Sequence, residues 1–156
     1  MGASDGPAAP SRRVRIEALP HLDAGDRARV ELPMDAADRR RVRRRLETPD
    51  GLTLELALPT GSVLTVGAVL HVDGSRAYVV AAALESTLVV RPRDLADAAR
   101  AGHLVGNLHR DLDVLDDGTL VALYDAPLET RLRAAGLRVT REDRPFGGRA
   151  PGEHAH

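Results

Sequence analysis

Cysteine and lysine are both missing from this chain of 156 residues. Without cysteine the protein can form no disulfide, no thiolate zinc site and no cysteine nucleophile. Because lysine is also absent, all 22 basic residues are arginines, and Schiff-base and phosphate-loop lysine chemistry is excluded. These two absences remove several classes of active site before any motif is considered.

Aromatic residues are scarce too, at 2% of the chain (Tyr78, Tyr124 and Phe146). The core must therefore be built mainly from valine, leucine and alanine. No apolar run approaches the length of a membrane span, and the first ten residues lack the apolar stretch of a signal peptide. We therefore expect a cytoplasmic protein that binds no membrane, and a net charge of -1 argues against a nucleic-acid partner.

The chain divides by its patterns into a leader, two domains and a tail. Residues 1–11 are rich in Gly, Ala, Pro and Ser and are expected to be a disordered leader. Residues 12–85 alternate apolar and polar positions between turn signals such as Thr48-Pro49-Asp50-Gly51, which predicts a small all-β domain. Its strands are expected at 14–19, 28–32, 43–47, 52–58, 63–70 and 76–84.

Residues 86–146 change to a mixed pattern. A strand at 88–91 leads to a helix that Asp94 caps, and Gly106-Asn107 is expected to break that helix. A hairpin turns at Asp116-Asp117-Gly118, and a second helix follows from Asp125 to Gly136, before a strand at 137–140. The order β-α-β-β-α-β is that of a ferredoxin-like domain. The predicted class is thus α+β with two domains, followed by a flexible histidine-containing tail at 147–156.

Six arginines fall between Arg39 and Arg45. Such a run can be a docking patch for an acidic partner or for nucleic acid. It can also be a solvated strand edge, where charge prevents unwanted pairing. We favour the edge, because no aromatic side chains for base stacking are interleaved, and keep a protein-interaction module that docks an acidic partner through Arg39–Arg45 as the alternative function.

Histidines are the remaining candidates for chemistry. His109 follows the first helix of the second domain, where it could be a metal ligand or simply a structural residue; from the residues alone the structural role is favoured. His103 lies six positions earlier, which is not a spacing that places two side chains together on a helix. His21 and His71 have no evident partner, and His154 and His156 lie in the tail. No nucleophile is paired with a base, so an enzyme is not expected.

Three stretches resemble the urease accessory protein UreE family: His103–His109 with the hairpin and Ala134–Thr140 behind it, Arg43–Gly51 leading to Leu58–Leu64, and Arg144–Gly147 before the tail. The resemblance implies a nickel metallochaperone that forms a homodimer through its second domains. His109 of each protomer would meet there and bind one Ni²⁺. It also implies delivery to apo-urease through the GTPase UreG, with the first domain, residues 12–85, of a chaperone-like peptide-binding type that serves partner contact.

A histidine ligand is consistent with nickel binding, but a complete coordination sphere needs more donors than two His109 side chains. Ni²⁺ prefers imidazole and usually takes four to six ligands, so two copies of His109 are too few. His154 and His156 match the histidine-bearing tails of the family, and His103 is a peripheral candidate. By the Irving–Williams order Cu²⁺ should compete with Ni²⁺, and Zn²⁺ is a further competitor. The family's auxiliary histidine cluster is replaced here by Leu123-Tyr124-Asp125-Ala126, so no auxiliary site is expected.

Overall fold

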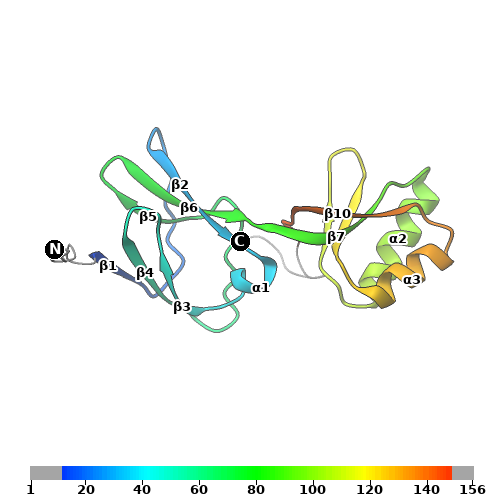
Figure 1. The fold of residues 1–156 in the computed structure, drawn as a ribbon, viewed down its shortest axis with the longest axis horizontal. Coiled ribbons are helices and arrows are strands. Elements are labelled where there is room, and N and C mark those ends of the chain that lie inside the picture. Colours follow the sequence, from blue (N-terminus) through cyan, green and yellow to red (C-terminus); the bar gives the residue numbers. More distant parts are fainter. Residues whose placement is uncertain (1–11, 149–156) are drawn as a thin grey trace, which may run out of the picture. The chain divides into compact units, whose positions relative to one another are not determined.

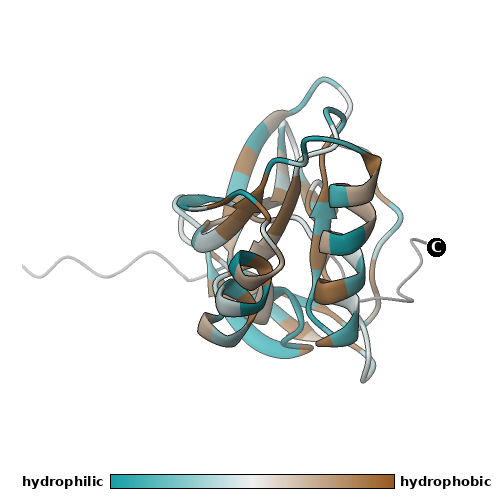
Figure 2. Ribbon diagram, turned by 90° about the vertical axis from the view of Figure 1, so that its right-hand side faces the viewer, coloured by the Kyte–Doolittle hydropathy of each residue, from teal (hydrophilic) through white to brown (hydrophobic). Residues whose placement is uncertain are grey.

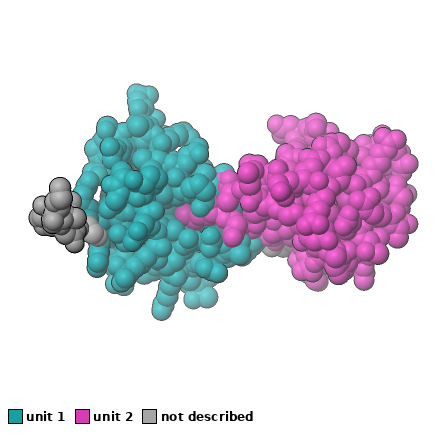
Figure 3. Space-filling view, in the orientation of Figure 1, with its two compact units in different colours: residues 1–33, 37–81 teal, residues 34–36, 82–156 magenta. Residues whose placement is uncertain are grey.

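The computed structural model describes residues 12–148, which fall into two compact units (Figures 1 and 3). The first unit comprises residues up to 33 together with 37–81, and the second comprises 34–36 and the chain from 82 onward. Strands dominate and helices are few, so the predicted α+β class is confirmed. The boundary expected after residue 85 lies instead after residue 81, and the second unit also takes in Met34–Ala36.

The first unit is built from two three-stranded sheets, with the strand orders β1-β4-β3 and β2-β6-β5. Strand β1 runs parallel to β4, whereas β3 runs antiparallel to it. In chain order its elements are β1 (Arg12–Ile16), β2 (Ala28–Met34), α1 (Ala36–Arg39), β3 (Arg43–Glu47), β4 (Leu52–Ala57), β5 (Val69–Asp73) and β6 (Arg76–Ala82). The one-turn helix α1 was not expected from the sequence.

The turn between β3 and β4 forms as its residues predict. The N–H of Gly51 donates to the carbonyl of Thr48 at 3.0 Å, and Gly51 has a φ of +82°, a conformation that costs glycine little. The strand expected at 63–70 is wrong. Gly67 has a φ of +88° and lies in a turn closed by Ala68 N–H and the carbonyl of Thr65, so β5 begins only at Val69.

A polar cluster ties the same turn to strand β6. The carboxylate of Asp50 accepts hydrogen bonds from Thr48 Oγ1 at 2.5 Å, from Tyr78 Oη at 2.7 Å and from Arg76 Nη1 at 2.5 Å. These bonds, that of Thr48 first and then that of Tyr78, hold the pKa of Asp50 well below its usual value. Because Tyr78 is completely buried, its hydroxyl needs such a partner, and Asp50 provides it.

The second unit is a four-stranded antiparallel sheet in the order β10-β7-β9-β8. Its elements follow the predicted β-α-β-β-α-β order: β7 (Leu84–Val90), α2 (Leu95–Asn107), β8 (Leu112–Val114), β9 (Leu120–Leu123), α3 (Ala126–Ala134) and β10 (Val139–Pro145). Strand β7 begins earlier than the expected 88–91. Among residues 12–148, no helix has both the length and the apolar composition needed to cross a membrane.

Both helices pack on one face of this sheet. Ala101 and Val105 of α2 and Leu128 and Leu132 of α3 join one core cluster with the strand residues beneath them. In Figure 2 the strands behind the two helices are mainly hydrophobic, whereas the helices also carry hydrophilic residues. This division is the one expected of amphipathic helices on a sheet.

The opposite face of the sheet has a smaller core of its own. Val89 of β7 and Val121 of β9 are fully buried there against Phe146 and Ala36. Phe146 follows β10 directly, so the chain turns back across this face after the last strand. Residues 146–148 are therefore held by packing.

Candidate metal centre

Helix α2 leads into the stretch that carries the candidate ligand. It begins as expected at the N-cap Asp94, whose side chain accepts from Asp97 N–H at 2.8 Å. Asp97 is itself buried, and its bonds to Arg93 hold its pKa below the usual value. The helix ends at Asn107, as the predicted break at Gly106-Asn107 requires, and it is capped by Leu108. The turn out of the helix falls on the residue that follows this cap.

That residue is His109, which has a φ of +52° and is the only non-glycine residue at positive φ among residues 12–148. Its N–H donates to the carbonyl of Gly106 at 2.9 Å, and the N–H of Arg110 donates to that of Val105 at 3.2 Å. These two bonds make a Schellman motif, in which the left-handed position is usually glycine. A histidine there is strained by its Cβ atom.

The second helix ends in the same motif with the usual residue. Gly136 has a φ of +75° and donates to the carbonyl of Arg133, while Leu137 donates to that of Leu132. Gly136 and His109 therefore occupy the same position of the same helix end. The chain thus has glycine at the end of α3 and histidine at the equivalent position after α2.

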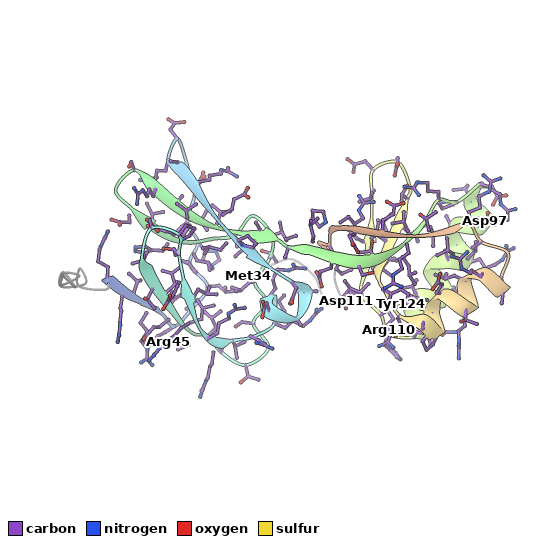
Figure 4. All side chains as sticks on the ribbon, in the orientation of Figure 1. Met34, Arg45, Asp97, Arg110, Asp111 and Tyr124 are labelled. Atoms are coloured by element: carbon purple, nitrogen blue, oxygen red, sulfur yellow. The ribbon has the colours of Figure 1, made fainter. Side chains whose placement is uncertain are left out.

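The His109 side chain is exposed, and among the described residues its ring forms no hydrogen bond. Its neighbour Arg110 is held in place, because Arg110 Nη2 donates to Asp125 Oδ2 at 2.6 Å. Asp125 is the N-cap of α3, and the preceding Tyr124 lies under the Arg141 guanidinium at 3.7 Å. Figure 4 labels Arg110 and Tyr124 near the start of α3. The imidazole is thus free while its backbone is fixed.

The other histidines are placed less favourably. His103 is exposed on α2, with its Nε2 3.3 Å from Asn107 Nδ2. His71 stacks on Tyr78 with ring centroids 5.8 Å apart, which is a structural contact. His21 is exposed in a loop. His154 and His156 lie outside the described residues.

Within residues 12–148 of one chain, no three His, Asp or Glu side chains gather to hold a metal ion. A site at His109 therefore needs donors from a second chain or from beyond Gly148. The described chain ends near Leu112, in the segment that follows His109. A Cβ atom added to Gly148 would lie 2.8 Å from the carbonyl carbon of Leu112, so the tail starts beside β8, a few residues after His109. Arg110, Asp125 and Gly148 were not predicted from the sequence to be parts of this region.

The arginine run does not form one surface. Arg39 is buried, and Asp38 pairs with both Arg44, at 3.0 Å, and Arg41, at 3.6 Å. The seven residues Arg39–Arg45, kept as an alternative docking patch, therefore do not present one continuous basic surface. Its exposed part lies on strand β3.

Comparison with known proteins relates this chain to one family over most of its length. Residues 13–83 match the family model described as UreE urease accessory protein, N-terminal domain. Urease accessory protein UreE of Deinococcus radiodurans is 54% identical over 129 residues, which cover 83% of each chain. That of Synechococcus sp. strain JA-3-3Ab is 54% identical over 127 residues, 81% of this chain and 85% of its own. That of Burkholderia mallei (strain ATCC 23344) is 38% identical over 109 residues, 68% of this chain and 59% of its own. With relatives this similar over most of its length, the chain belongs to the urease accessory protein UreE family, whose members are accessory chaperones and not enzymes.

Proposed function

We propose that this protein is a homodimeric nickel chaperone for urease maturation, in which His109 of each protomer binds one shared Ni²⁺. The observation that carries the proposal is the conformation of His109. An exposed histidine occupies a left-handed helix end that Gly136 fills in the neighbouring helix. Such strain at an exposed residue is typical of a functional position.

The donor set fits nickel. Imidazole suits Ni²⁺, and the His109 ring has no competing hydrogen-bond partner among residues 12–148. Two imidazoles leave coordination positions for water and for His154 and His156 of the tail. His154 is six residues beyond Gly148, so an extended chain reaches about 20 Å from there. His103 is assigned a peripheral role, because its ring nitrogen faces Asn107.

Such a site suits delivery better than storage. Ligands on a tail exchange easily, and imidazole binds metal only when neutral, so protons compete with the ion. Cu²⁺ and Zn²⁺ compete for the same donors, and selectivity comes from docking to the cytoplasmic partners, UreG and apo-urease. This is the role that the family resemblance implies.

Calorimetric titration of the full chain with Ni²⁺ tests the proposal. We expect about one tight ion per dimer. The variant His109→Asn is the sharpest probe, because asparagine tolerates the left-handed conformation but lacks the imidazole. It should lose tight binding while sedimentation shows the dimer retained. The variant His103→Ala serves as the control and should keep tight binding. Unchanged affinity in His109→Asn would refute the assignment.

The contribution of the tail is tested separately by ending the chain at Gly148. This truncation keeps the described fold and removes His154 and His156. We expect weaker Ni²⁺ binding with the same stoichiometry. An unchanged affinity would remove both tail histidines from the site and leave His109 as its main protein ligand.

A further inference from the structure

A three-residue segment from between β2 and α1 is built into the second unit. Met34–Ala36 belongs to this unit, although its neighbours along the chain, Pro33 and Ala37, belong to the first. Both Met34 and Ala36 are buried, with 1% and 2% of their surface exposed. We call this segment the strap, and specific contacts hold it in place.

Two hydrogen bonds fix the strap beside the start of β7. The N–H of Ala83 donates to the carbonyl of Met34 at 3.0 Å, and the N–H of Ala36 donates to Glu85 Oε2 at 3.0 Å. Because side chains alternate between the faces of a strand, Glu85 points to the same face of the sheet as Val89. The strap is therefore docked on the face opposite the two helices.

The strap also helps to bury Phe146. Ala36 shares a core cluster with Phe146, Val89 and Val121, and Phe146 is completely buried. Val89 and Val121 are paired on neighbouring strands, so they form the floor beneath the ring. Ala36 reaches this cluster from a distant part of the chain, and the burial of the ring therefore depends in part on the strap.

The same ring supports the start of the tail. A Cβ atom added to Gly148 would overlap the Phe146 ring and would lie 2.8 Å from the carbonyl carbon of Leu112. The Gly148 backbone is therefore packed against both the ring and β8. Packing thus continues from Ala36 through Phe146 to Gly148, which is the last described residue.

We propose that the strap is a latch on the tail: Met34–Ala36 and Phe146 open together, and their opening frees the chain from Gly148 onward. A segment held by one buried methyl group and two hydrogen bonds opens at a lower free energy than the whole fold. Because β2 ends and α1 begins within the strap, a shift of either element acts on the tail. For nickel this inference rests on the proposed function, in which His154 and His156 are ligands.

Thiol labelling of the native, metal-free, full-length protein tests the latch, because the chain has no cysteine of its own. One cysteine replaces a buried alanine, either in the strap (Ala36→Cys) or in the core under the helices (Ala101→Cys). Each labelling rate is divided by the rate in the unfolded protein. We expect Ala36→Cys to be labelled at least about tenfold faster, since local opening suffices. Equal rates would mean that the strap opens only on global unfolding, and would overturn the proposal.

Coupling to the tail is measured in the same Ala36→Cys protein. Adding Gly148→Ala crowds the Phe146 ring and should speed labelling by about tenfold, because opening relieves the overlap. Gly147→Ala is the matched control: its Cβ atom would lie 3.6 Å from Asp113 Oδ2, and the rate should change by less than about twofold. Equal rates in the two backgrounds would show that the strap opens independently of Phe146, which contradicts the latch.

The coupling should also run from the strap to the ring. Phe146 is the only phenylalanine of the chain, so 4-fluorophenylalanine gives a single ¹⁹F signal. Ala36→Asp places a carboxylate in an apolar cluster beside Glu85 and should lift the strap, moving the signal to its value in the unfolded chain. Ala37→Asp makes the same change at an exposed neighbour and should leave the signal unchanged. A buried signal in both variants would refute the latch, and the labelling rates decide if Ala36→Asp fails to fold.

A nickel titration of the same two variants separates this inference from the proposed function. A fixed tail start raises the effective concentration of the tail histidines, so Ala36→Asp should bind Ni²⁺ about threefold or more weakly than Ala37→Asp. Equal affinities would overturn the role of the latch in nickel binding. If the unmodified protein bound no Ni²⁺ tightly, the proposed function would fail, whereas the metal-free measurements would still decide whether the strap and Phe146 open together.

Discussion

The backbone of Gly148 lies directly against that of Leu112, so that a Cβ atom at Gly148 would be 2.8 Å from the Leu112 carbonyl carbon and would also overlap the Phe146 ring. Gly148→Ala must therefore push the start of the tail away from β8 or displace Phe146 from its core. We expect the variant to lose about 1–3 kcal/mol of unfolding free energy, as overpacked sites do. Urea denaturation measures the loss.

Gly147→Ala is the matched control for that variant. The nearest atom to a Cβ at Gly147 is Asp113 Oδ2 at 3.6 Å, an ordinary contact, so its stability should stay within about 0.5 kcal/mol of the parent. If the tail supplies nickel ligands, Gly148→Ala should also weaken Ni²⁺ binding, whereas Gly147→Ala should not. Equal stability of the two variants would show that the close packing at Gly148 carries no cost.

His109 and Gly136 occupy equivalent positions at two helix ends, and substitutions at them should change the free energy of unfolding in opposite directions. His109→Gly relieves the left-handed strain and should stabilise the fold by about 1 kcal/mol, while Gly136→Ala introduces it and should destabilise by a similar amount. Thermal and urea unfolding at neutral pH without metal give both values. A stability loss in His109→Gly would mean that the histidine contributes contacts of its own to the apo fold.

Arg110 is expected to position the segment that carries His109, through its bond to Asp125. Arg110→Ala removes the bond to Asp125, and because the arginine is half exposed the stability change should be no more than about 1 kcal/mol. Ni²⁺ affinity should nevertheless fall, since the segment that carries His109 loses its tie to α3. Calorimetry should show the same stoichiometry with a weaker binding constant. Arg133→Ala is the control, because it breaks a comparable exposed pair with Glu129 within α3.

The Asp50 cluster predicts how stability depends on pH. Because the pKa of Asp50 is lowered in the fold, its contribution is fully present above the ordinary carboxyl pKa of about 4 and is lost as the pH falls below it. Asp50→Asn removes this titration. It should therefore be less stable than the parent at pH 7, and its unfolding midpoint in urea should fall less between pH 7 and pH 3. An equal fall of the urea midpoint in the parent and in Asp50→Asn between pH 7 and pH 3 would contradict this account.

Sequence reasoning succeeded where a structure depends on neighbouring residues. The caps Asp94 and Asp125, the glycine stop at Gly136 and the turn at Gly51 are all in their expected places. Each is a local device, in which one side chain or one missing Cβ atom satisfies backbone groups a few residues away. The strand predicted at 63–70 was wrong because the apolar residues around Gly67 suggested a continuous strand, whereas the chain turns at Gly67.

Features made by distant residues could not be read from the sequence. Asp50 meets Arg76 and Tyr78 across more than twenty positions, and the outer position of strand β3 depends on β1 joining the far side of β4. The left-handed histidine had no local signal either, because Gly106 nearby was the residue expected to end the helix. The metal ligation by His109, His154, His156 and His103 stays a prediction.

The helix end at His109 also has a consequence for how this position can change over time. For folding alone glycine would be the better residue here, since that exchange removes the strain and touches no core residue. Histidine can persist there only while something outside the fold selects for its ring. On the proposed nickel role, His109 should thus be among the first residues of the second unit to drift in lineages that have given up urease, toward residues that tolerate the left-handed conformation, such as glycine or asparagine.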